Sequence, residues 1–136
     1  MVETMDRTLG FFSLSTLVLM LVTASMLTST TGSNVAVGPD GAAQVAKGFI
    51  LNEPTFKFDG MKDTLKVNVT GTYPDPGMYE VTGDFTCAHG GYGDRNGVIV
   101  TEALTPHECR IIISNGEVTS AVMDGTYDMV EQKQVQ

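Results

Sequence analysis

The segment that decides the architecture of this chain runs from residue 9 to residue 27 and reads LGFFSLSTLVLMLVTASML. It lies within a stretch from Thr8 to Pro39 that contains no charged side chain. As a helix rising about 1.5 Å per residue, it would be about 28 Å long, close to the ~30 Å hydrocarbon core of a bilayer. It shows no polar face of the kind that a helix on a soluble domain has. We therefore predict a transmembrane helix over residues 9–29, after a short flank over residues 1–8.

Three fates of this segment fit the pattern. A retained single-pass anchor is the main prediction, and pilin-type processing is one alternative. A cleaved secretory signal is the other, because Val22-Thr23-Ala24 before Ser25 resembles a small-residue cleavage site. Arg7 and the amino terminus are the only positive charges near the segment. We therefore expect the amino end in the cytoplasm and the rest of the chain outside, at a cell surface or in a periplasm.

One stripe of the predicted helix carries small hydroxylated side chains and a methionine at spacings of three, four and three. These residues are Ser13, Thr16, Met20 and Thr23. Small polar side chains allow transmembrane helices to approach closely and to form hydrogen bonds across the contact. The stripe therefore predicts packing against other membrane-spanning subunits. In the alternative interpretation, each hydroxyl bonds to its own preceding turn and faces lipid.

Beyond the apolar segment, Thr, Ser, Gly and a Pro39-Asp40-Gly41 turn signal predict a linker over residues 30–47. Residues 48–130 then alternate apolar and polar side chains, for example around Phe56 and Phe58 and along residues 65–70. Turn signals such as Asn115-Gly116 separate these runs.

This alternation predicts a mainly β fold, an antiparallel immunoglobulin-like β-sandwich over residues 48–130. A polar tail without a pattern follows over residues 131–136.

The only two cysteines, Cys87 and Cys109, fall on the inward parity of their predicted strands. Outside the cytoplasm a disulfide is the default for such a pair, and it would stabilise the domain by about 3 kcal/mol. The alternatives are free thiols and a copper or zinc site. With Cys87 opposite Cys109, His89 would fall opposite His107, which gives the two sulfur and two nitrogen donors that these metals accept. Donors two residues apart on a strand are ~7 Å apart, which disfavours closure around one ion.

Residues 90–97 form a glycine-rich loop without the pattern of a phosphate-binding loop. We expect a hairpin tip that displays Tyr92 and Arg95 as a contact surface, with a merely solvated loop as the alternative. A separate motif, Asn68-Val69-Thr70, is an acceptor sequence for N-glycosylation, and Asn68 has the outward parity.

The 16 acidic and 8 basic residues give a net charge of -8, which argues against a nucleic-acid partner. The chain contains no nucleophile elbow, HExxH motif, dinucleotide-binding fingerprint or kinase signature. We therefore expect neither catalysis nor a cofactor.

The amino-terminal block has Gly10 followed by Phe11-Phe12-Ser13-Leu14-Ser15-Thr16-Leu17-Val18. In this outline it resembles type IV pilin-like proteins, including archaeal pilins and archaellum subunits. The resemblance implies processing after the glycine, a hydrophobic helix and a β-rich head. Ser15 stands at the fifth position of such a mature chain, where bacterial pilins carry glutamate.

Together these features predict a non-enzymatic, single-pass membrane subunit of a larger membrane or cell-surface assembly. Its expected partners are the bilayer and other membrane or surface subunits, with self-assembly as a further possibility. One alternative is a pilin-like subunit of an extracellular filament. The other is an extracytoplasmic copper- or zinc-binding domain.

Overall fold

The computed structural model describes residues 37–136. The predicted transmembrane helix, its packing stripe and the pilin-like block lie outside the described residues. Within residues 37–136, no helix is long and apolar enough to cross a membrane.

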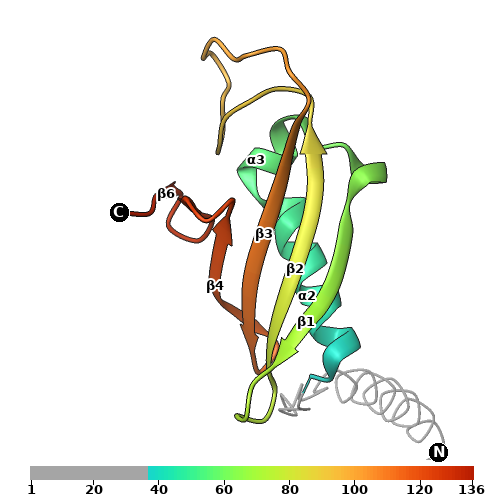
Figure 1. Cartoon of the computed structure of the whole chain (residues 1–136). Coiled ribbons are helices and arrows are strands. Elements are labelled where there is room, and N and C mark those ends of the chain that lie inside the picture. Colours follow the sequence, from blue (N-terminus) through green and yellow to red (C-terminus); the bar gives the residue numbers. More distant parts are fainter. Residues whose placement is uncertain (1–36) are drawn as a thin grey trace, which may run out of the picture. The chain divides into compact units, whose positions relative to one another are not determined.

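The described chain is mainly β and forms one antiparallel sheet of six strands in sequential order, β1 to β6. Its helices precede the sheet, and α2 lies against one face of it (Figure 1). The elements are α2 (Pro39–Asn52), α3 (Pro54–Asp59), the 3-10 helix η1 (Lys62–Thr64), β1 (Lys66–Thr72), β2 (Met78–Cys87), β3 (Thr105–Ser114), β4 (Glu117–Met123), β5 (Tyr127–Asp128) and β6 (Lys133–Gln134).

The predicted sandwich is wrong, because residues 48–130 supply strands to one sheet only, and a helix takes the place of the second sheet. The alternating strands do have one buried face, and α2 covers it. Ala42, Ala46 and Ile50 recur every four residues along α2 and are fully buried. This spacing places all three on one side of the helix.

The described part of the predicted linker, residues 37–47, is therefore helical from Pro39 onward. Pro39 occupies the first turn of α2 and Asp40 lies beside it. Proline is favoured at this position because its missing N–H would have no helical partner, and an acidic residue suits the positive end of the helix. The Pro-Asp-Gly signal marks the start of a helix rather than a turn.

The alternation at Phe56 and Phe58 is not a strand either, since both residues lie in α3. Glu53 caps this helix, and its Oε2 accepts hydrogen bonds from the backbone N of Thr55 (2.7 Å) and of Phe56 (3.2 Å). Phe56 turns inward and meets Phe85 of β2 edge to face, with ring centroids 5.0 Å apart. The predicted polar tail also contains a short element, because β6 pairs with β5.

Helix α2 packs against Gly83 of β2 through the side chain of Ile50. A Cβ atom built there would fall on Cδ1 of Ile50, whereas a Cβ on Gly48 of α2 would meet nothing within 4 Å. We expect Gly83→Val to lower the free energy of unfolding by about 1–3 kcal/mol, because the core is overfilled. Gly48→Ala should raise it by roughly 0.5–1 kcal/mol through helix propensity. Chemical denaturation of both variants checks the pair, and equal effects would contradict this contact.

Candidate functional site: the loop between β2 and β3

The most distinctive feature of the described chain is the loop over residues 88–104, which joins the two longest strands. It projects beyond the end of the sheet (Figure 1). Loops longer than about 12–15 residues without secondary structure are uncommon in compact domains and are usually functional or disordered. Side chains of the loop and of α3 give this one a defined base.

Arg95 is the centre of that base and is only 5% exposed. Its Nη1 donates to the carbonyl oxygens of His89 (3.2 Å), Gly90 (3.0 Å) and Gly91 (2.9 Å). The loop is therefore folded around the guanidinium group. The prediction that Arg95 is displayed at a contact surface is wrong.

The other side of the Arg95 guanidinium joins the loop to α3. Nη2 donates to the carbonyl oxygen of Thr55 (3.0 Å) and to Oδ1 of Asp59 (2.9 Å). The guanidinium carbon also lies 4.5 Å from the centre of the Phe58 ring, a cation–π distance. Arg95 thus connects residues that are about 40 positions apart in the sequence.

Asp59 holds the same loop through His89. Its Oδ2 accepts a hydrogen bond from the backbone N of His89 at 2.7 Å and lies 2.7 Å from Nδ1 of the same residue. Burial alone would raise the pKa of Asp59, but hydrogen bonds from His89 and Cys87 and the charge of Arg95 lower it below its ordinary value. Asp59 is therefore ionised at neutral pH, and its negative charge balances the positive charge of Arg95.

The lowered pKa of Asp59 makes its contribution to stability depend on pH. A depressed folded-state pKa gives stability that is complete above the unfolded-state value near 3.8 and is lost as the pH falls through the folded-state value. We therefore expect Asp59→Asn to destabilise the domain at pH 7, and we expect the difference from the unmodified protein to shrink below about pH 4. Urea denaturation between pH 3 and pH 7 measures this. A difference that stays constant over that range would contradict the role of Asp59.

A second aspartate–histidine pair lies beside the loop. His107 has a side chain that is 1% exposed, and its Nδ1 lies 2.7 Å from Oδ2 of Asp124. Tyr92 of the loop donates its hydroxyl to the same oxygen (2.9 Å), and its ring stacks on Tyr127 with centroids 4.9 Å apart. Tyr92 is thus half-buried and fixes the loop to the end of β4, instead of standing free as a contact residue.

The two cysteines do not meet. Cys87 lies opposite Thr105 and Cys109 lies opposite Gly83, so the cysteines are offset by four positions along adjacent strands. That offset is about 13 Å, whereas a disulfide needs Cα atoms within about 7 Å. Both are buried free thiols, and the predicted disulfide is wrong. Parity placed both side chains correctly on the inner face, but it does not fix the register.

The same register separates the four predicted metal ligands. His89 pairs with Asp59 and His107 pairs with Asp124, so neither histidine pairs with a cysteine. Among residues 37–136 no group of three or more His, Cys, Asp or Glu side chains lies close enough to hold a metal ion. The proposed copper or zinc site is therefore contradicted in the part of the chain that the structure describes.

Cys87, His89 and Asp59 lie near one another, as a thiol nucleophile, a histidine base and a carboxylate would. Burial raises the pKa of Cys87 to about 12, and its Sγ lies 3.6 Å from the carbonyl oxygen of Thr55. Burial likewise raises the pKa of Cys109. Since the thiolate is the reactive form, neither cysteine is activated at neutral pH.

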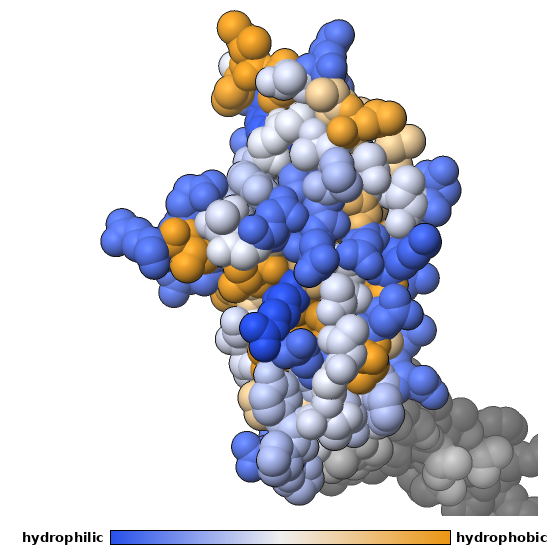
Figure 2. All heavy atoms as spheres, in the orientation of Figure 1, coloured by the Kyte–Doolittle hydropathy of each residue, from blue (hydrophilic) through white to orange (hydrophobic). Residues whose placement is uncertain are grey.

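The outer part of the loop is apolar and open to solvent. Val98 is 63% exposed, Ile99 is 100% exposed and Leu104 is 70% exposed. Figure 2 shows hydrophobic residues gathered at this end of the domain. We call these three side chains the apolar tip. Sequence reasoning missed it, because Val98-Ile99-Val100 after an Asn-Gly turn has the same pattern as the first residues of a buried strand.

Asn68 lies exposed on β1, the first strand at the edge of the sheet, with half-buried valines on both sides. The position is open enough for a glycan, and its modification stays a prediction.

Comparisons of the chain with protein-family models, with curated proteins and with solved structures find no match.

Proposed function

We propose that this protein is a non-enzymatic, single-pass membrane subunit whose outer domain makes protein contacts in a larger assembly. In this proposal residues 9–29 anchor the chain, and the side chains of Ser13, Thr16, Met20 and Thr23 pack against neighbouring spans. The domain over residues 37–136 is held outside the membrane, with the amino end in the cytoplasm.

The observation that carries the proposal is the apolar tip on its fixed base. Ile99 is completely exposed, although only a few residues away Arg95 makes five hydrogen bonds and is almost completely buried. Val98 and Ile99 are neighbours in the loop, and adjacent exposed apolar side chains can form part of an interaction site. A rigid base lowers the conformational entropy that such a loop loses on binding.

Two measurements test the proposal. Membranes from cells that make the protein are washed with alkaline carbonate, and the mature amino terminus is determined by mass spectrometry. We expect the protein to stay in the membrane pellet with residues 9–29 present. Release into the wash as a chain that lacks this segment would contradict it. A mature terminus at Phe11 would favour the pilin-like filament subunit instead.

A further inference from the structure

The dipeptide Asn-Gly occurs twice in this chain, as Asn96-Gly97 in the loop between β2 and β3 and as Asn115-Gly116 in the turn between β3 and β4. In an Asn-Gly pair the side-chain amide can react with the backbone nitrogen that follows it. Glycine favours this reaction because it has no side chain to hinder the approach and adopts many backbone conformations. The two pairs therefore share one local chemistry, and the structure around them differs.

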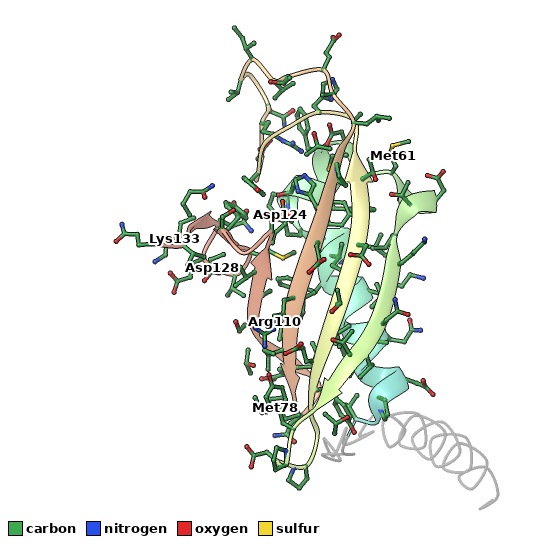
Figure 3. All side chains as sticks on the ribbon, in the orientation of Figure 1. Met61, Met78, Arg110, Asp124, Asp128 and Lys133 are labelled. Carbon is green, nitrogen blue, oxygen red and sulfur yellow. The ribbon has the colours of Figure 1, made fainter. Side chains whose placement is uncertain are left out.

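The pair Asn115-Gly116 is held in a closed turn. Its two residues join β3 directly to β4 with φ angles of 51° and 83°. The backbone N of Asn115 donates to the carbonyl oxygen of Gly77 (2.9 Å), and Cγ2 of Val37 lies 2.8 Å from the place of a Cβ on Gly116. Figure 3 shows Met78, the residue after Gly77, at the end of the sheet away from the loop. This turn cannot rearrange without losing these contacts.

The pair Asn96-Gly97 is open by comparison. Both residues are exposed, and a Cβ on Gly97 would meet nothing within 4 Å. One backbone hydrogen bond spans the pair, from N of Val98 to the carbonyl oxygen of Arg95 (3.1 Å). The backbone at Gly97 can therefore change its conformation at little cost in packing.

Asp94 restrains the side chain of Asn96. Its Oδ1 accepts one hydrogen bond from the backbone N of Asn96 (3.0 Å) and a second from Nδ2 (2.6 Å). The side-chain amide is thus drawn toward Asp94, on the side away from Gly97. If this amide became a carboxylate, the donor would be lost and two negative charges would lie side by side and repel each other.

We infer that Asn96 is a site of spontaneous deamidation, and that its conversion loosens the part of the loop that leads into the apolar tip. The backbone N of Gly97 attacks Cγ of Asn96 and forms a C–N bond, the bond from Cγ to Nδ2 breaks, and ammonia leaves with the proton of the Gly97 N–H. Water then opens the cyclic imide at either carbonyl and gives aspartate or isoaspartate. The sequence needs no oxidant, metal or cofactor.

The modification acts on the outer part of the loop. Val98 and Ile99 follow the pair directly, so the product carries a new negative charge beside the apolar tip. Arg95 keeps its own hydrogen bonds to α3 and to the first residues of the loop, so the base stays folded. The inference goes beyond the proposed function and does not depend on the membrane anchor, because every contact that it uses lies within residues 37–136.

The test incubates the full chain in mild detergent at neutral pH and follows both asparagines by peptide mapping with mass spectrometry. We expect Asn96 to convert at least tenfold faster than Asn115 in the folded protein. In urea the two rates should agree within about threefold, because the fold alone separates them. Asp94→Ala should raise the rate at Asn96 at least threefold and leave the rate at Asn115 unchanged.

A second measurement tests the consequence for the loop. Hydrogen exchange over residues 94–99 should rise at least fivefold in Asn96→Asp, whereas exchange over residues 88–92 should stay the same. Asn96→Gln is the matched control, because it keeps an amide donor and adds no charge, and it should exchange like the unmodified protein.

Equal rates at the two asparagines in the folded protein, or a faster rate at Asn115, would overturn the deamidation site. A rate at Asn96 that does not change in Asp94→Ala would overturn the restraint by Asp94. Equal exchange in Asn96→Asp and Asn96→Gln would overturn the loosening of the loop. Each of these failures leaves the proposed function unaffected.

Discussion

Replacement of Arg95 by alanine is expected to lower the free energy of unfolding by about 3–5 kcal/mol, the usual cost of removing one partner of a buried ion pair. Asp59 would remain as a carboxylate that is 10% exposed, without its cation. The carbonyl oxygens of His89, Gly90 and Gly91 would lose their donor at the same time. We also expect hydrogen exchange across residues 88–104 to rise, because Arg95 holds this loop together.

The matched control for Arg95 is Arg110→Ala. Arg110 is also paired with a carboxylate, but it is exposed, and exposed ion pairs contribute little to stability. Urea denaturation of the two variants should therefore give a large effect for Arg95 and almost none for Arg110. Similar effects at both positions would mean that the loop does not depend on its buried guanidinium group.

The second large effect is expected at Ala46 of α2, within the residues that the sequence predicts as a linker. Ala46 is completely buried against the sheet, so Ala46→Glu forces an unpaired carboxylate into the core. We expect a loss of about 3–5 kcal/mol or failure to fold. Thermal unfolding followed by circular dichroism measures this loss.

Lys47→Glu introduces the same residue one position later, on the exposed side of α2. Its thermal midpoint should stay close to that of the unmodified protein. A flexible linker would tolerate glutamate at both positions. Unchanged thermal midpoints in both variants would therefore contradict the helix and its contact with the sheet.

The strands could be predicted from the sequence because the alternation of apolar and polar side chains is a local signal. Residues 65–70 alternate as expected, and β1 contains most of them. Asn115 and Gly116 have positive φ angles of 51° and 83° and join β3 to β4, as the Asn-Gly signal predicts. In both cases the residues that decide the structure are neighbours in the chain.

Helix α2 could not be predicted because its stripe consists mainly of alanines, and Gly41 and Gly48 lower its helix propensity. The cysteine pairing failed for another reason. Alternation tells which face of a strand a residue occupies, but the register depends on the length and course of the loop between the strands. The loop over residues 88–104 sets Cys87 opposite Thr105.

The sequence predicts where the candidate site lies, but not which residues build it. The glycines over residues 90–97 do mark a loop, but the role of Arg95 depends on Thr55 and Asp59, which lie 40 and 36 positions earlier. No local pattern contains such partners. The exposure of Ile99 likewise follows from the projection of the loop beyond the sheet.

The most direct test of the central claim compares the size of the native complexes formed by the unmodified protein and by Ile99→Asp. Both are extracted in mild detergent from membranes of cells that make the protein, and their masses are measured by light scattering. We predict that the unmodified protein elutes in an assembly several times larger than one chain, and that Ile99→Asp remains in the membrane fraction but elutes with a much smaller mass. An unmodified protein that elutes as a single chain, or an Ile99→Asp variant with the same mass as the unmodified complex, would contradict it.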